Sequence, residues 1–115
     1  MILTGEELPP IHHVTQQHLE AVFDESDFGR FLVLARNDRD FLQTACLWET
    51  TPECEQFLKR TGSLPYSLEC REDSTDKMLR AEGWLTLEEI QEAFTGFLLG
   101  KQTWKQTKVW KNIET

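Results

Sequence analysis

The sequence predicts an α+β domain built on an antiparallel four-stranded sheet, and three observations predict it. Two pairs of strand-like segments, residues 30–36 with 41–48 and residues 65–72 with 77–83, are each joined by a short polar turn, as in a β-hairpin. Helical patterns stand before, between and after the two pairs. The expected order is therefore α-β-β-α-β-β-α, with the helices packed on one face of the sheet and the other face partly wet.

The first helical pattern begins after residue 15. Thr15 is a residue type that caps helices well, and Leu19 and Phe23, four residues apart, lie on one apolar stripe. The carboxylates within residues 24–27 are unfavourable at a helix C-terminus, and Gly29 breaks the pattern. We therefore expect the helix to end in an acidic loop.

The strands of the second hairpin carry the clearest alternation. In residues 65–72, Leu68 and Cys70 point to one side of the strand, whereas Glu69 and Arg71 point to the other. The strand at 30–36 is identified instead by its Val, Leu and Phe content. The charged side chains are therefore expected on the face of the sheet opposite the helices.

Two further helices are marked by their termini. Thr51-Pro52-Glu53 combines a capping residue, a proline in the first turn and an acidic residue, and Gly62 ends this short helix. Thr86 and Glu89 form a capping box for the last helix. Gly100 stands where a residue with left-handed backbone closes a helix.

The chain shows no internal repeat and no linker, so we expect a single domain over residues 1–115. Pro9-Pro10 predicts an extended arm at residues 1–13, and residues 101–115 are expected to pack on the body as a basic, Trp-containing tail. The longest apolar run falls far short of the roughly 18 residues that cross a bilayer. No signal peptide is recognisable. A cytoplasmic location is expected, with a leaderless secreted effector left open.

The net charge of −8 is unevenly distributed. The tail carries four lysines against Glu114, a charge of +3, so the other 100 residues carry −11. Such a body repels nucleic acids and anionic membranes and attracts a basic protein. The same charge could equally serve only solubility.

Four polar residues are expected to meet on the wet face of the sheet: Gln43, Glu69, Arg71 and Arg80. A pair of arginines around a carboxylate can recognise a carboxylate or phosphate group by paired hydrogen bonds. The alternative is that these residues only form cross-strand ion pairs on a solvated surface.

No enzyme signature is present. His13 and His18 are five residues apart, so one helix face does not present both to a metal ion, and no zinc motif completes the set. Cys54 is the best candidate for an exposed thiol, but no histidine stands near it to act as a base. Nucleotide-binding and nucleophile-elbow motifs are lacking. We therefore predict a non-enzyme without cofactor or metal.

The tail interleaves lysines with Trp104 and Trp110. That pattern can bind single-stranded nucleic acid by stacking and phosphate contacts. The acidic body favours another interpretation, in which the tryptophans cover the edge of the core and the lysines offset the negative charge. Tryptophan-rich segments also form dimer interfaces, so both a monomer and a homodimer remain open.

These features together resemble small acidic bacterial proteins. The matching segments cover residues 15–110 and include Phe31-Leu32-Val33-Leu34, Leu68-Glu69-Cys70-Arg71-Glu72, Leu79-Arg80-Ala81, the helix at residues 85–97 and Trp104. The pattern is similar to that of the immunity proteins that neutralise polymorphic bacterial toxins. The resemblance implies a stoichiometric inhibitor of a toxin and carries over no catalytic residue.

The sequence thus favours a non-catalytic binding module for a basic protein partner, with neither nucleic acid nor membrane as its target. The expected contacts are the acidic loop and the polar sheet face: Asp24, Glu25, Asp27, Gln43, Glu69, Arg71 and Arg80. The alternative is a sensor of a small molecule or anion that uses the arginines of the sheet face, or an uncharacterised bacterial domain of another function.

Overall fold

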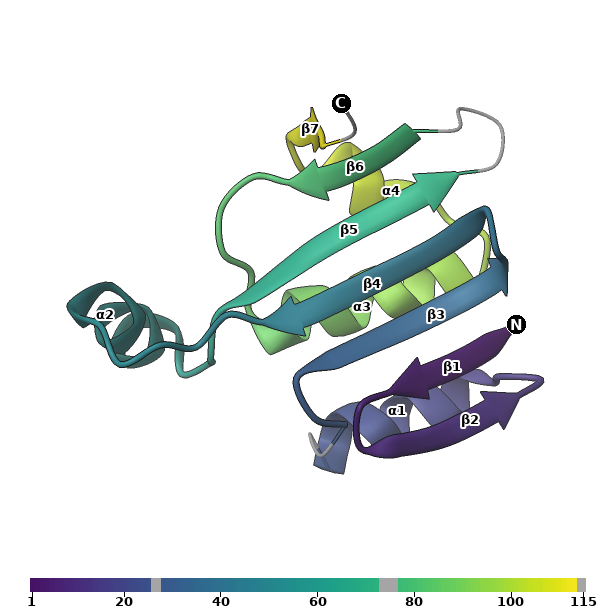
Figure 1. Cartoon of the computed structure of the whole chain (residues 1–115), viewed down its shortest axis with the longest axis horizontal. Helices are drawn as coiled ribbons and strands as arrows, with labels where there is room; N and C mark the ends of the chain where they lie inside the picture. Colours follow the sequence, from purple (N-terminus) through teal and green to yellow (C-terminus); the bar gives the residue numbers. More distant parts are fainter. Residues whose placement is uncertain (26–27, 73–76, 114–115) are drawn as a thin grey trace.

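The computed structural model describes residues 1–25, 28–72 and 77–113, which form one antiparallel sheet with helices on one side of it (Figure 1). The strands are β1 (Ile2–Gly5), β2 (Leu8–His12), β3 (Phe31–Asn37), β4 (Asp40–Cys46), β5 (Tyr66–Glu72), β6 (Lys77–Ala81) and β7 (Trp110–Asn112). The helices are α1 (Gln16–Glu25), α2 (Pro52–Thr61), α3 (Leu87–Leu98) and α4 (Thr103–Gln106). This arrangement confirms the α+β class.

The prediction of a four-stranded sheet was wrong, because the described chain forms a seven-stranded sheet in the order β2-β1-β3-β4-β5-β6-β7. The arm is a β-hairpin: β1 pairs with β2 on one side and with β3 on the other. The tail contributes β7, which pairs with β6. These strands have only three to five residues and therefore carry little alternation of their own. Pro9 and Pro10 are tolerated because β2 is an edge strand and its pairing with β1 is irregular between Leu3 and Gly5, opposite the two prolines.

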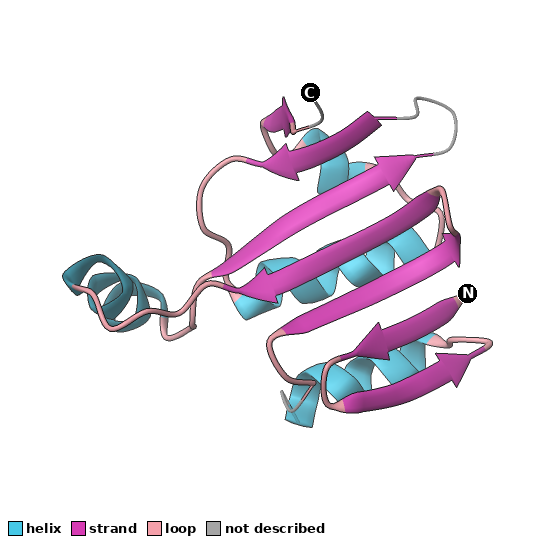
Figure 2. Ribbon diagram, viewed as in Figure 1, coloured by secondary structure: helices cyan, strands magenta, loops and turns pink. Residues whose placement is uncertain are grey.

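The core lies between the sheet and the helices α1, α3 and α4, which all cover the same face (Figure 2). Leu32 and Leu34 of β3 and Leu68 of β5 point into it, so the alternation predicted for the fifth strand is correct. The ring of Phe94 in α3 meets the ring of Phe23 in α1 edge-on, with centroids 5.6 Å apart. Apolar burial of this kind is the main force that holds the helical layer on the sheet.

Helix α2 departs from the predicted packing on the face of the sheet. It projects beyond the end of the sheet, in the connection between β4 and β5 (Figure 1). Only Cys54 and Phe57 of its residues are buried, an apolar face too small to hold it on the core. The predicted ends are confirmed, since Thr51 accepts a hydrogen bond from the Cys54 amide and Gly62 has a φ of 74°.

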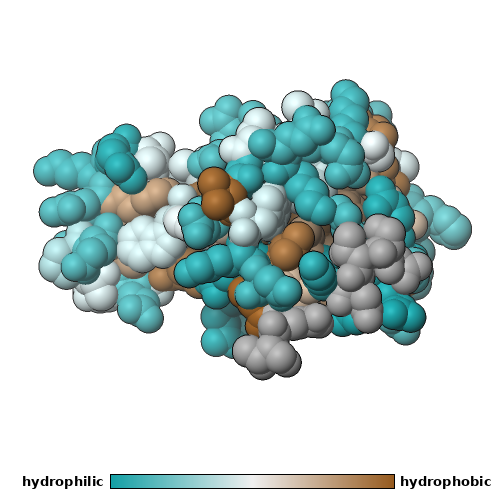
Figure 3. Space-filling view, turned by 90° about the horizontal axis from the view of Figure 1, so that it is seen from above, coloured by the Kyte–Doolittle hydropathy of each residue, from teal (hydrophilic) through white to brown (hydrophobic). Residues whose placement is uncertain are grey.

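Apolar side chains reach the surface near α2. Trp48, Leu58, Leu64 and Trp84 are each more than a third exposed. Seen from the β6–β7 edge, apolar side chains interrupt a largely hydrophilic surface (Figure 3). The ring of Trp84 packs edge-on against that of Phe57, with centroids 5.7 Å apart, so this tryptophan fixes α2 to the body.

Helix α3 is capped as predicted. The hydroxyl of Thr86 accepts from the backbone N–H of Glu89 at 3.2 Å, and the Glu89 carboxylate accepts from the N–H of Thr86 at 3.1 Å. Two otherwise unpaired amides are thus satisfied where the helix begins. Among the described residues, no helix combines the length and apolar character that crossing a bilayer requires.

Candidate functional site

The strand register brings together three of the four residues predicted for the sheet face. Gln43 of β4 lies opposite Glu69 of β5, which in turn lies opposite Arg80 of β6. The Gln43 side-chain amide donates a hydrogen bond to the Glu69 carboxylate at 2.7 Å. These side chains project from the face away from the helices, because their neighbours along the strands, Leu42 and Leu68, are fully buried.

Arg71 shares this face but occupies the next row. Its partners in the register are Phe41 on one side and Met78 on the other. The Glu69 carboxylate accepts a hydrogen bond from the Gln43 amide and lies opposite Arg80 in the register. An anion that approached the Arg80 guanidinium would therefore compete with this carboxylate. The four residues share a face, as predicted; a role for that face in anion binding finds no support in this arrangement and stays a prediction.

The open face is more apolar than the sequence analysis predicted. Alternate positions of β1, β3, β4 and β6 all point away from the helices, and the apolar residues among them are Ile2, Phe31, Val33, Ala35, Phe41, Ala45 and Met78. Phe31 is 43% exposed and Ile2 is 41% exposed. The signal in the sequence was the unbroken apolar run at residues 31–35, which puts apolar side chains on both sides of one strand.

The acidic loop does not join this surface. Asp24 and Glu25 are exposed at the end of α1, and Asp27 lies outside the described residues. Helix α1 packs through Leu19 and Phe23 on the covered side of the sheet, so its carboxylates belong to the helical side. The predicted contact set therefore falls on two opposite faces and does not form one binding surface.

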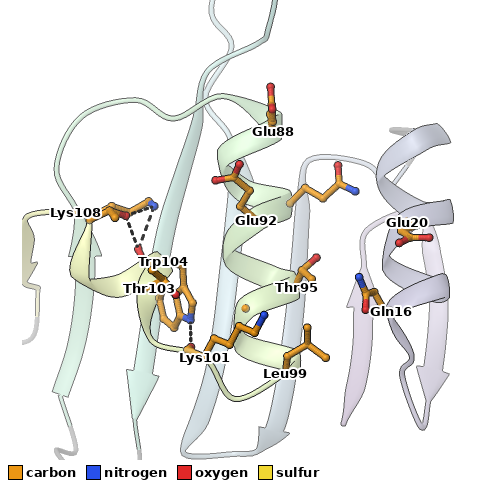
Figure 4. Close-up of a pocket in the computed structure, with 13 residues that line it drawn as sticks. Gln16, Glu20, Glu88, Glu92, Thr95, Leu99, Lys101, Thr103, Trp104 and Lys108 are labelled. Atoms are coloured by element: carbon orange, nitrogen blue, oxygen red, sulfur yellow. Dashed lines mark hydrogen bonds between the residues drawn. The ribbon is translucent and has the colours of Figure 1, made fainter.

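A groove runs along α3, with α1 on one side and the α4 segment on the other (Figure 4), and is called the α1–α3 groove here. Its volume is about 540 Å³. Glu20 of α1 and Glu88 and Glu92 of α3 line it, with Lys101 and Lys108 on the α4 side. Leu99, which is 49% exposed, provides an apolar contact on its wall.

The two helices beside the groove carry one sign of charge. Together, Gln16–Glu25 and Leu87–Leu98 contain six acidic residues and neither lysine nor arginine: Glu20, Asp24, Glu25, Glu88, Glu89 and Glu92. Sequence analysis missed this surface because the helices lie far apart in the chain and are joined only by packing. The signal that could have found it is the lack of basic residues in both helical segments.

Trp104 of the tail belongs to the core, and Trp110 is partly buried against it. Trp104 is buried; its indole N–H donates to the Lys101 carbonyl at 2.8 Å, and that of Trp110 donates to the Lys105 carbonyl at 2.8 Å. Lys105 forms an ion pair with Glu72 at 2.7 Å. A buried indole has no free face on which a base could stack, so this geometry favours the packing interpretation over nucleic-acid binding.

No group suited to nucleophilic catalysis or metal binding emerges from the described ranges. Cys54, the best candidate for an exposed thiol, is 2% exposed and directs its sulfur at the Leu47 carbonyl. The prediction that it is exposed was wrong, because the thiol faces the body from the first turn of α2. Across the described residues, no three His, Cys, Asp or Glu side chains are grouped closely enough to hold a metal ion.

Comparisons with protein-family models, curated proteins and solved structures give no match for this chain. Its function is therefore argued from its surfaces alone, since even a shared fold would not by itself assign an activity.

Stability is expected to fall as pH rises from 9.0 towards 11. Burial raises the pKa of the Cys70 thiol from 9.0 to about 11, and burial also raises the pKa of Tyr66. A raised pKa keeps the folded thiol neutral while the unfolded thiol ionises, so the stabilisation is complete below pH 9.0 and is lost above it.

Urea unfolding at a series of pH values would measure this slope for the wild type and for Cys70→Ala. The variant should show a shallower decline, with Tyr66 accounting for part of what remains. Equal slopes in the two proteins would contradict the assignment to Cys70.

Proposed function

We propose that this protein is a non-catalytic binding module whose α1–α3 groove docks a basic segment of a partner protein. The observation that carries the proposal is the charge of α1 and α3: neither helix has a lysine or arginine, and Glu20, Glu88 and Glu92 line the groove between them, with Lys101 and Lys108 only on the α4 side. Carboxylates gathered along the α1 and α3 walls of a concave surface raise the local concentration of a basic partner and speed its association.

The shape of the groove favours an extended or helical segment. Amphipathic helices bind in grooves by placing a few apolar anchors while charged residues set their orientation. Leu99 offers a site for one such anchor, and Glu20, Glu88 and Glu92 would face the basic side chains around it. Lys101 and Lys108 on the α4 side would direct the basic side chains of the segment towards the α1 side, because like charges repel.

A basic toxin is the partner that best fits this surface together with the resemblance to immunity proteins. In that role the protein would act in the cytoplasm as a stoichiometric inhibitor. It would need no catalytic group, because occupation of the toxin surface alone blocks its activity. The protein encoded by an adjacent gene, if basic, is the first partner to test.

The test is calorimetric titration with the product of that adjacent gene and with a synthetic amphipathic peptide rich in lysine and arginine. Glu20→Lys/Glu92→Lys should weaken binding at least about tenfold, since each reversed charge costs on the order of 1 kcal/mol near a surface. Added salt should weaken the wild-type complex.

The matched control is Glu49→Lys/Glu82→Lys, which changes the net charge equally at two exposed loop positions away from the groove. It should bind almost as the wild type does. If both double variants lose affinity equally, net charge and not the groove is responsible. If neither loses affinity, the helical layer is not the docking surface.

A further inference from the structure

The second surface of note is the open face of the sheet. From this side no described helix covers the strands (Figure 1). A sheet face exposed to water normally carries polar side chains at alternate positions. Here one row across the sheet reads His12, Ile2, Ala35, Phe41, Arg71 and Met78, so four of its six residues are apolar.

The size of this face approaches what a stable interface needs. Seven strands about 4.8 Å apart, with central strands about 20 Å long, give an area on the order of 600 Å². A stable interface buries about 800 Å² on each partner. Side chains at the rim, such as the exposed Phe31, would supply part of the difference.

The charges on the two sides of the sheet indicate through which side two copies of the chain can meet. The open face carries both signs: Glu69, Arg80 and Lys111 follow one another in one row across the strands, and Arg71 lies in the next row. In a two-fold contact the same patch meets itself, so a patch with both signs can place its carboxylate against the partner's guanidinium. Helices α1 and α3, which carry six carboxylates and neither lysine nor arginine, would repel their own copies.

The edges of the sheet are unsuited to strand pairing between copies. The outer strand β2 carries Pro9 and Pro10, and β7 at the other edge has three residues, including Lys111. Prolines, short strands and lysines are the usual features that prevent edge-to-edge association. The face, not the edge, is therefore the route by which two sheets can meet.

We propose that two copies of this chain form an isologous dimer by packing their open sheet faces together. The apolar row and Val33 would form the centre of the interface, as between the two layers of a β-sandwich about 10 Å apart. Glu69, Arg71 and Arg80 would fix the relative orientation. The proposal is independent of the α1–α3 groove, which stays exposed on the outer side of each copy.

Sedimentation equilibrium of the full chain across the micromolar range should show a monomer–dimer equilibrium. Val33→Glu should raise the dimer dissociation constant at least about tenfold, because it buries a charge at the centre of the contact. The control Leu58→Glu puts the same charge at an exposed apolar position on α2 and should leave the constant unchanged. Circular dichroism would establish that both variants are folded.

A charge exchange keeps the test independent of any loss of fold. Glu69→Arg makes the face basic, whereas Arg71→Glu/Arg80→Glu makes it acidic. Each variant alone should be mainly monomeric, and an equimolar mixture should form a heterodimer. A monomeric wild type, a dimer insensitive to Val33→Glu, or two folded variants that do not associate on mixing would each overturn the proposal.

Discussion

Phe94→Ala is expected to destabilise the protein by about 3–5 kcal/mol, the usual cost of removing a buried aromatic ring. Phe94 is fully buried between α3 and the sheet, and its ring contacts that of Phe23. Truncation removes this contact and leaves a cavity at the junction of α1, α3 and the strands. Because a domain of this size is stable by about 5–15 kcal/mol, the loss is a large fraction of the total.

Urea unfolding followed by tryptophan fluorescence would measure this change. Leu99→Ala is the matched control, since Leu99 follows the same helix but is 49% exposed and should cost under about 1 kcal/mol. Comparable losses in the two variants would show that Phe94 does not occupy the centre of the core.

Trp104→Ala is the second substitution with a large expected effect, about 3–5 kcal/mol, and it is coupled to Gly96. A methyl group added at Gly96 would lie 2.6 Å from Cδ1 of the Trp104 ring, closer than two carbon atoms can approach. Gly96→Ala should therefore destabilise the protein by about 1–3 kcal/mol. In an exposed helix the same change would stabilise by about 1 kcal/mol.

The double variant decides whether this contact is the cause. With Trp104 already truncated, Gly96→Ala should become neutral or stabilising, because nothing then opposes the added methyl group. A double-mutant cycle from urea unfolding gives the coupling between the two positions. If the two changes in unfolding free energy simply add, Gly96 is constrained by something other than Trp104.

The local features of the fold were predictable, as particular residues illustrate. The caps of α2 and α3 depend on residues three positions apart, and the alternation in β5 depends on residues two apart. Such patterns act within one element and need no knowledge of its neighbours. The common face of Gln43, Glu69, Arg71 and Arg80 followed from this alternation once adjacent strands were paired in register.

The missing strands and the groove were not predictable in this way. Strands β1, β2 and β7 are too short to be identified without their partners, and Leu3 reaches the core through the pairing of β1 with β3. Asp24 and Glu25 were expected as contacts because they stand in an acidic loop, although the predicted packing of the helices already placed α1 opposite the charged sheet face. The acidic groove depends on two helices whose association is specified by Phe23 and Phe94, far apart in the chain.

By itself the sequence determined the α+β class, the caps of two helices, the negative charge and the common face of Gln43, Glu69, Arg71 and Arg80. Only the tertiary structure decided that the sheet has seven strands, that the acidic helices share a groove, and that the predicted contacts lie on opposite faces. The physical reason is range: helix caps and strand alternation act over a few residues, whereas surfaces arise where distant segments pack together and bury their apolar sides.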